Sequence, residues 1–207
     1  MLEKVLERDT KYFIFDSLKN VSDESCLCED YQLIDFDETK KIIIKEFTLS
    51  TLASCDGLYF NNSINFLEFK GFKKIKSKLS PKENLEQKEE KFIQKLESSL
   101  IDKIESSIWI LDLILKQKSL NLTQNDKINY RKIDKNYYIV TDIDLTKPSK
   151  DTFLARLNGL AEIPSSLYNN LITNVKIIID NIELNVKINK PKLIDCNELK
   201  KYLEEKT

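Results

Sequence analysis

The chain has 207 residues, of which 41% are apolar and 32% charged, and its net charge is −1. This composition is typical of one globular domain and argues against a disordered chain. Histidine is absent, which excludes histidine-based acid–base catalysis and removes the commonest zinc ligand. Any catalysis must therefore use carboxylates, lysine, tyrosine, cysteine or a metal held by carboxylates.

The sequence lacks the features of membrane-spanning, secreted and zinc-ribbon proteins. No apolar run is long enough to span a membrane, and the N-terminus has no signal-peptide core, so we expect a cytoplasmic protein with no membrane partner. Only Cys26 and Cys28 are close in sequence among four cysteines, and this spacing does not match a zinc ribbon. We expect Cys55, Cys196 and the other two to be reduced and mostly buried.

The first seventy residues are expected to be rich in strands. Residues 12–15 are compatible with a strand or with the start of a helix. The runs 31–36 and 41–47 flank a polar tetrapeptide and predict a hairpin. A second hairpin is expected from residues 55–60 and 64–70, which flank Asn61-Asn62-Ser63.

A long helix is expected next, from Glu83 to Lys118. Apolar residues recur every three or four positions from Phe92 to Leu115, which marks one buried face, and Trp109 lies in a stretch that we expect to be core. We then expect a loop at 121–129, a strand at 136–144, a helix at 151–163, a hairpin from 175–180 and 182–188, and a helix at 197–205. This order predicts a mixed α/β domain, with a central mixed β-sheet covered by the long helix on at least one face.

The second hairpin carries the candidate chemistry. With a three-residue loop, Phe60 faces Ile64, and the register brings Asp56 directly opposite Glu68. Directly opposed Cβ atoms lie about 5 Å apart, a separation that one magnesium ion could bridge. Lys70 shares the face of Glu68 because side chains alternate along a strand.

The bare triplet of an acid, any residue and a lysine has no weight here, because it occurs seven times in the chain. Context distinguishes Glu68-Phe69-Lys70, which ends an otherwise apolar strand where unused charges are costly. The alternative is a surface hairpin on which Glu68 and Lys70 are ordinary solvated charges.

Asp56, followed by Glu68-Phe69-Lys70 on the next strand, a long helix and another strand, resembles the PD-(D/E)XK nuclease superfamily, whose core is α-β-β-β-α-β. The resemblance covers approximately residues 40–145. It implies a restriction endonuclease-like core within a single domain of residues 1–207, with small N- and C-terminal elaborations. The C-terminal one is a helix-hairpin-helix extension at approximately 150–207.

The resemblance implies a Mg²⁺ or Mn²⁺ site formed by Asp56, Glu68 and the backbone carbonyl of Phe69, with Lys70 positioning or activating the attacking water. The family often adds an acid from a helix before the first strand. Glu38 or Glu46 could serve, although the expected hairpin at 31–47 places neither on a helix. Cys55 also stands where the family often has proline.

The function implied is a metal-dependent nuclease that hydrolyses phosphodiester bonds in the setting of prokaryotic defence or mobile elements, with DNA as the expected substrate and RNA as the alternative. A local basic patch next to the motif fits a phosphate backbone; it comprises Lys73, Lys74, Lys76, Lys78 and Lys82. The alternative is a catalytically inactive nuclease-like or other α/β module that binds protein or nucleic acid. Either could be a homodimer or a subunit of a complex.

Overall fold

The computed structural model describes residues 11–72, 85–117, 120–145 and 162–204. In this part of the chain the strands form one six-stranded sheet, whose spatial order follows the sequence. The strands are β1 (Ile14–Ser17), β2 (Gln32–Asp35), β3 (Gly57–Phe60), β4 (Ile64–Lys70), β5 (Lys135–Thr141) and β6 (Lys192–Asp195). The pairs β1–β2, β2–β3 and β3–β4 are antiparallel, whereas β4–β5 and β5–β6 are parallel. The expected mixed α/β sheet is confirmed.

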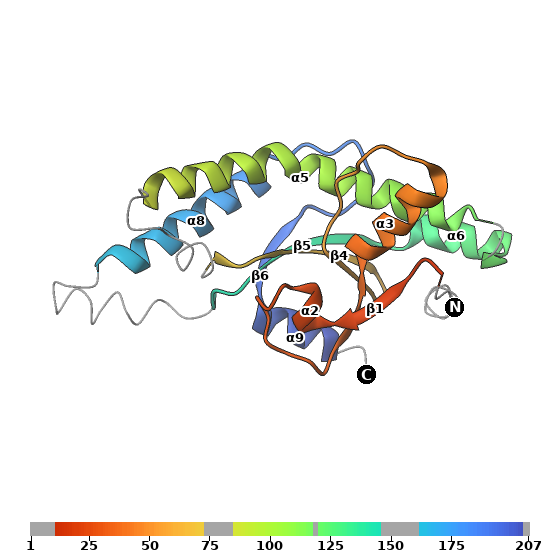
Figure 1. The fold of residues 1–207 in the computed structure, drawn as a ribbon, viewed down its shortest axis with the longest axis horizontal. Coiled ribbons are helices and arrows are strands. Elements are labelled where there is room, and N and C mark those ends of the chain that lie inside the picture. The colour runs from red at the N-terminus through yellow and green to blue at the C-terminus, as the bar shows by residue number, and fades with distance from the viewer. Residues whose placement is uncertain (1–10, 73–84, 118–119, 146–161, 205–207) are drawn as a thin grey trace.

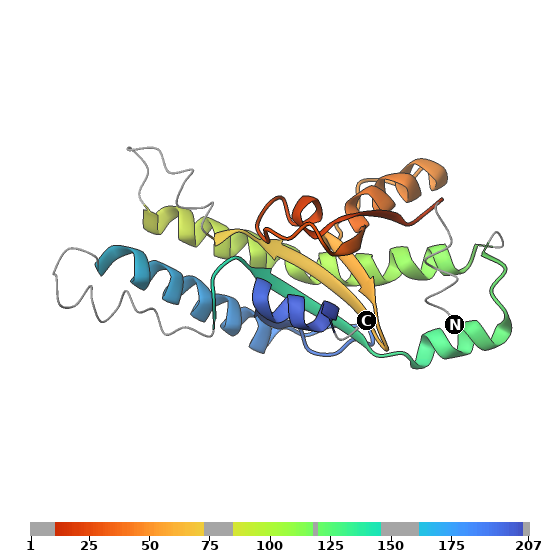
Figure 2. The same ribbon diagram turned by 90° about the horizontal axis from the view of Figure 1, so that it is seen from below.

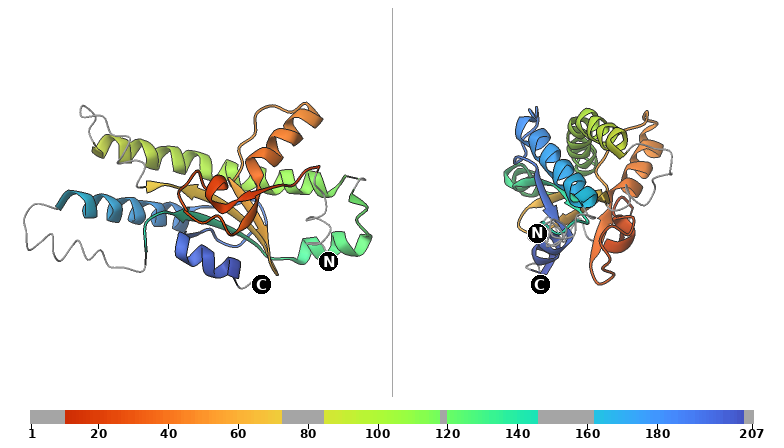
Figure 3. Two further views of the ribbon diagram at one scale, coloured as in Figure 1. Left: turned by 60° about the horizontal axis from the view of Figure 1, so that its bottom comes forward. Right: turned by 90° about the vertical axis from the view of Figure 1, so that its left-hand side faces the viewer.

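Helices cover both faces of this sheet (Figure 1). The described helices are α2 (Leu18–Val21), α3 (Phe36–Phe47), α5 (Leu85–Leu115), α6 (Gln124–Lys132), α8 (Glu162–Asn181) and α9 (Cys196–Glu204). Helices α5 and α8 lie side by side on one face (Figure 3). Helices α2 and α9 lie on the other face, with α9 against β5 and β6 (Figure 2).

Side-chain alternation along β4 explains the two layers. Phe66 packs into the core that α3, α5 and α8 share with the sheet. Leu67 and Phe69 point the other way, into a smaller core with Leu199 and Leu203 of α9. Glu68 and Lys70 have the parity of Phe66 and therefore face α5.

The long helix was predicted correctly, but one of its residues was not. Leu100, Ile104 and Leu111 of α5 are fully buried, in agreement with the expected apolar face. Trp109 is 45% exposed, so the expectation that it is a core residue was wrong. It lies on the side of α5 that faces away from the sheet, because the neighbouring positions Ile108 and Ile110 already fill the buried side.

The hairpin expected at residues 31–47 is wrong in its second half. Residues 32–35 do form a strand, but Phe36–Phe47 is the helix α3. The side chain of Asp35 accepts a hydrogen bond from the backbone N–H of Glu38 and caps the helix. Phe36, Thr39 and Ile43 then recur at helical spacing and bury one face.

The expected C-terminal hairpin is also wrong. Residues 175–181 belong to α8, and residues 182–188 form no strand. Most of the helix expected at 151–163 lies outside the described residues. The helix expected at 197–205 corresponds to α9, and the loop expected at 121–129 is replaced after its first residues by α6.

A disulfide joins the two ends of the described chain. Cys26, in the loop after α2, is bonded to Cys196 at the start of α9 across a separation of 170 residues. The expectation of reduced thiols was therefore wrong for these two residues. It holds for Cys28 and Cys55, which are free, and Cys55 is buried. In the described part of the chain no helix is both long enough and apolar enough to cross a bilayer.

Candidate functional site

The β3–β4 turn sets the geometry of the site. Phe60 pairs with Ile64 across a three-residue loop, and the antiparallel register continues to Gly57 and Leu67. The side chain of Asn61 fixes the turn by accepting hydrogen bonds from the N–H and hydroxyl of Ser63, at 3.0 and 2.7 Å. The paired residues end at Gly57 and Leu67, so Asp56 lies one residue before the ladder, and its predicted pairing with Glu68 is not among the paired residues.

Asp56 lies just before β3 and is held by β4. Its backbone N–H donates to the carbonyl of Leu67, at 2.9 Å. Its Oδ2 accepts a hydrogen bond from the backbone N–H of Phe69, at 2.6 Å. The carboxyl group is therefore fixed against the β4 backbone, and its Oδ1 remains directed toward α5.

Glu68 is a fully buried carboxylate with three partners. Its Oε1 accepts hydrogen bonds from the ammonium groups of Lys70 and Lys103, each at 2.5 Å. The hydroxyl of Tyr137, on β5, donates to Oε2 at 3.3 Å. Burial of this charge is tolerable because opposite charges and a hydrogen bond compensate for the lost water.

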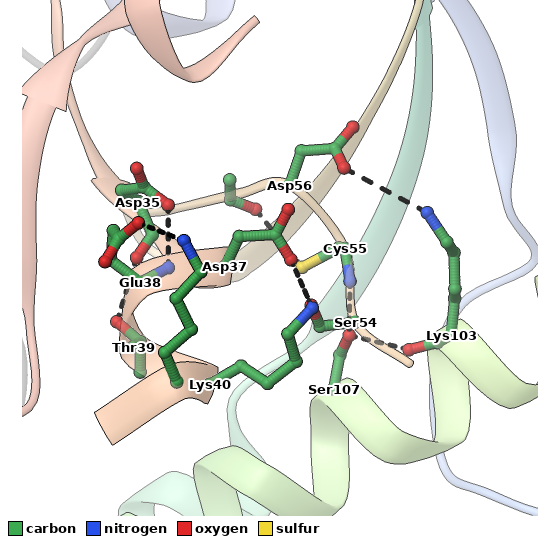
Figure 4. Close-up of polar contacts among 12 residues, drawn as sticks. Asp35, Asp37, Glu38, Thr39, Lys40, Ser54, Cys55, Asp56, Lys103 and Ser107 are labelled. Carbon is green, nitrogen blue, oxygen red and sulfur yellow. Dashed lines mark hydrogen bonds and ion pairs between the residues drawn. The ribbon is translucent and has the colours of Figure 1, made fainter. Parts of the chain in front are cut away.

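Lys103 connects both carboxylates and was missed by the sequence analysis. It comes from α5, and its Nζ lies 4.0 Å from Oδ1 of Asp56, as Figure 4 shows. The same Nζ lies 2.5 Å from Oε1 of Glu68. A signal for it existed, because Lys103 and Ser107 share the helical face of Leu100 and Ile104. Polar residues on a buried helical face need partners. Ser107 uses its hydroxyl to accept a hydrogen bond from the N–H of Cys55.

Burial and close charges shift the pKa values of several groups around Asp56 and Glu68. Burial, followed by the neighbouring charge of Glu68, raises the pKa of Asp56 to about 7. Burial alone would lower the pKa of Lys103, but the charges of Glu68 and Asp56 outweigh it and the net shift is upward. Burial and the nearby Glu68 raise the pKa of Tyr137, so its hydroxyl stays protonated as a donor.

A cavity of about 530 Å³ opens beside Asp56, Phe69 and Lys70. The start of α3, shown in Figure 4, contributes acids to its wall, and residues of α2 and of the loop after it also line the cavity. Those acids are Asp35, Asp37 and Glu38. The cavity is therefore acidic, apart from Lys70 and Lys41.

The two candidates for an upstream acid are thus distinguished. Both lie on a helix, contrary to the expected hairpin. Glu38 lines the cavity with Asp56 and pairs with Lys41. Glu46 lies in the last turn of α3, where it accepts hydrogen bonds from Lys11 and from the hydroxyl of Tyr12. Of these two, Glu38 shares a cavity with Asp56, whereas neither Glu46 nor Glu68 lines it.

The residues present fit a hard divalent cation in their chemistry, since carboxylate oxygens are the ligands that Mg²⁺ prefers. However, no group of three or more acids and thiols within the described ranges converges at metal-binding distances. The ammonium group of Lys103 occupies the space between Asp56 and Glu68. A cation shared by these two carboxylates would require Lys103 to withdraw.

One set of predicted contacts falls beyond the part of the chain that the structure describes. The basic patch of Lys73, Lys74, Lys76, Lys78 and Lys82 lies outside the described residues. Phe72 is fully buried and packs edge-on against Phe92, with ring centroids 5.4 Å apart, so it offers no surface for a base. Comparison with protein-family models, curated proteins and solved structures finds no match to this chain.

Proposed function

We propose that this protein is a metal-dependent nuclease that hydrolyses phosphodiester bonds, in DNA rather than RNA, with Mg²⁺ or Mn²⁺ as cofactor. One observation carries the proposal: the carboxylates of Asp56 and Glu68 converge on Lys103, with Lys70 bonded to Glu68 and the acidic cavity beside Asp56 and Lys70. A pair of carboxylates with a lysine, at the end of the central strands of a sheet, suits cleavage of a phosphodiester without histidine.

The order of elements supports a nuclease-like core in part. From α3 onward the chain runs helix, strand, strand, two helices, strand, and β5 returns parallel to β4. The expected core has three strands between its first two helices, whereas two are present here. A third antiparallel strand, β2, lies beside β3 but precedes α3. The restriction endonuclease-like assignment therefore stays a proposal.

Each residue has a distinct part in this proposal. Asp56 and Glu68 would hold the metal, with Glu38 as the nearest further acid and the Phe69 carbonyl as a further ligand. When bound, the metal would polarise the phosphate and lower the pKa of a bound water. Lys70, whose side chain is 22% exposed and lines the cavity, would place positive charge where the transition state gains negative charge.

The test is cleavage of supercoiled plasmid, linear duplex, single-stranded DNA and RNA by purified protein with Mg²⁺ or Mn²⁺. Removing an electrostatic contributor of this kind costs about 10²–10³ in rate, so Glu68→Gln and Lys70→Ala should lose cleavage at that level. Lys95→Ala, an exposed lysine on α5, is the matched control and should cleave normally. Equal cleavage by all four proteins would refute the assignment of the site.

A second candidate is a catalytically inactive module that binds protein or nucleic acid within a complex. It is favoured by Lys103, because Lys70 and Lys103 already neutralise the two carboxylates without a metal. Calorimetric titration with Mn²⁺ distinguishes the candidates. Binding by the wild type that is lost in Asp56→Asn supports the nuclease. Absence of binding in both the wild type and Lys103→Met supports the inactive module.

A further inference from the structure

A second cavity, of about 220 Å³, is lined by residues from the end of α5, from α6 and from the segment between them. Figure 1 shows where these two helices lie. Its charged lining comes from Lys116, Lys127 and Arg131, with Asp112 as its acid. Asp112 follows Lys103 by nine residues along α5, a distance of about 13 Å along the helix axis. The two cavities have no lining residue in common.

No carboxylate among the described residues forms an ion pair with the cations of this cavity. Among the described residues, none of Lys116, Lys127 and Arg131 forms a side-chain ion pair, and all three are exposed. The carboxylate of Asp112 is already engaged, because its Oδ1 accepts a short hydrogen bond from the hydroxyl of Tyr130. Three positive charges thus face one negative charge.

Helix dipoles reduce this excess but do not remove it. Lys116 follows the end of α5, and Arg131 lies in the last turn of α6, where basic residues are common for structural reasons. Each helix end contributes about half a negative charge. Lys127 lies in the middle of α6 and has no such role. A net positive charge of about one remains in the cavity.

The rest of the lining defines the kind of anion. Leu115 and Leu122 give the cavity an apolar wall beside the cations. Arg131 is the one arginine in the described part of the chain, and its planar guanidinium matches the geometry of phosphate oxygens in a way that lysine does not. The ammonium group of Lys135 lies 4.4 Å from the ring centre of Tyr130 and adds positive charge behind the cavity wall.

We propose that this cavity binds a small organic phosphate, with the phosphate held by Arg131, Lys127 and Lys116 and the organic part lying against Leu115 and Leu122. The volume suits a phosphate with part of its organic group, and is below that of cavities that enclose a whole drug-sized ligand. The proposal does not depend on the Asp56–Glu68 site.

The test is calorimetric titration of the full chain with adenosine monophosphate, adenosine and inorganic phosphate. We expect the monophosphate to bind, adenosine not to bind, and phosphate alone to bind more weakly. Loss of one charge-assisted hydrogen bond is worth about 1.5–3 kcal/mol, so Arg131→Gln should weaken binding of the monophosphate by about tenfold or more. Lys127→Gln should weaken it several-fold.

Lys132→Gln is the matched control. Lys132 is the neighbour of Arg131 on α6, is exposed, and does not line the cavity, so this variant should bind with unchanged affinity. Glu68→Gln should also bind normally, which separates this result from the nuclease assignment. Equal weakening by Arg131→Gln and Lys132→Gln, or binding of a single-stranded oligonucleotide without binding of the monophosphate, would overturn the proposal.

Discussion

Glu68 is buried with its charge balanced by ammonium groups from two elements, Lys70 of β4 and Lys103 of α5. When a buried carboxylate loses its only charged partner, the protein is destabilised by several kcal/mol. Because Glu68 keeps Lys70, we expect Lys103→Met to lower the free energy of unfolding by about 1–3 kcal/mol, measured by urea denaturation.

Two variants control this measurement. Lys95→Met removes an exposed lysine from the same helix and should change the free energy of unfolding by less than about 0.5 kcal/mol. Glu68→Gln combined with Lys103→Met should be less destabilising than the sum of the single changes, because the two residues interact directly. Additivity of the two changes would contradict the pairing.

Replacing Asp56 should stabilise the fold, whereas replacing Lys103 should destabilise it. The folded-state pKa of Asp56, about 7, lies above its ordinary value of 3.8, so ionisation destabilises the fold increasingly between these two values. In metal-free buffer, Asp56→Asn should therefore increase the free energy of unfolding by about 1–3 kcal/mol at pH 8. The gain should shrink markedly near pH 4, where Asp56 is protonated in the folded state but still partly ionised in the unfolded state.

Urea denaturation at pH 4, 6 and 8 measures this difference, with Asp102→Asn as the control. Asp102 is an exposed acid on α5, and its replacement should show no such pH dependence. A gain for Asp56→Asn that is equal at all three pH values would show that burial beside Glu68 does not govern its ionisation.

At the scale of residues, the sequence predicted that Asp56 and Glu68 lie near each other, but not that Lys103 contacts both. The pairing of Phe60 with Ile64, which brings the two acids near each other, follows from local information, namely the length of the turn and the alternation along two strands. The approach of Lys103 depends on how α5 is rotated and placed over the sheet. That placement is decided by packing across 35 residues of chain, which local patterns do not encode.

At the scale of elements, α3 shows why the hairpin prediction failed. Ile42-Ile43-Ile44 is a β-branched run that favours a strand. The tertiary structure overrides this preference, because Ile43 is buried in the shared core while Ile42 and Ile44 lie on other sides of the helix. The spacing of Asp35 and Glu38 was a helix-start signal that could have corrected the prediction.

The cap of α3 can be tested directly. Asp35→Ala removes the acceptor for the N–H of Glu38 and should lower the free energy of unfolding by about 1 kcal/mol. Asp35→Ser retains an acceptor and should recover most of this loss. Thermal or urea denaturation of both variants measures the effect. Equal losses would mean that Asp35 acts through the acidic cavity rather than as a cap.

At the scale of the whole molecule, the order of the strands in the sheet could not be predicted from the sequence. Strands β3 and β4 are neighbours in the chain and were predicted as a pair, whereas β4 and β5 pair across the whole of α5 and α6. Strand β6 had not been expected, because Lys192–Asp195 is short and follows a polar segment. Its pairing with β5 is set by the packing of α8 and α9 on opposite faces.

The disulfide between Cys26 and Cys196 is also a feature of this scale, since no local pattern relates residues 170 positions apart. Closing a long loop in the unfolded chain stabilises a protein by about 2–4 kcal/mol. We therefore expect Cys26→Ser combined with Cys196→Ser to melt about 5–15 °C lower than the wild type in calorimetry. Cys28→Ser, which removes a free thiol two residues away, is the control and should melt normally.

The same bond makes most of the chain a covalent ring, from residue 26 to residue 196. A protease that cuts once anywhere inside this ring leaves a single molecule that only a reductant can separate. Singly nicked protein should therefore migrate as one species on a denaturing gel without reductant and as two with it. The helices that carry Lys103 and Arg131 would stay tethered to the sheet even after such a cut.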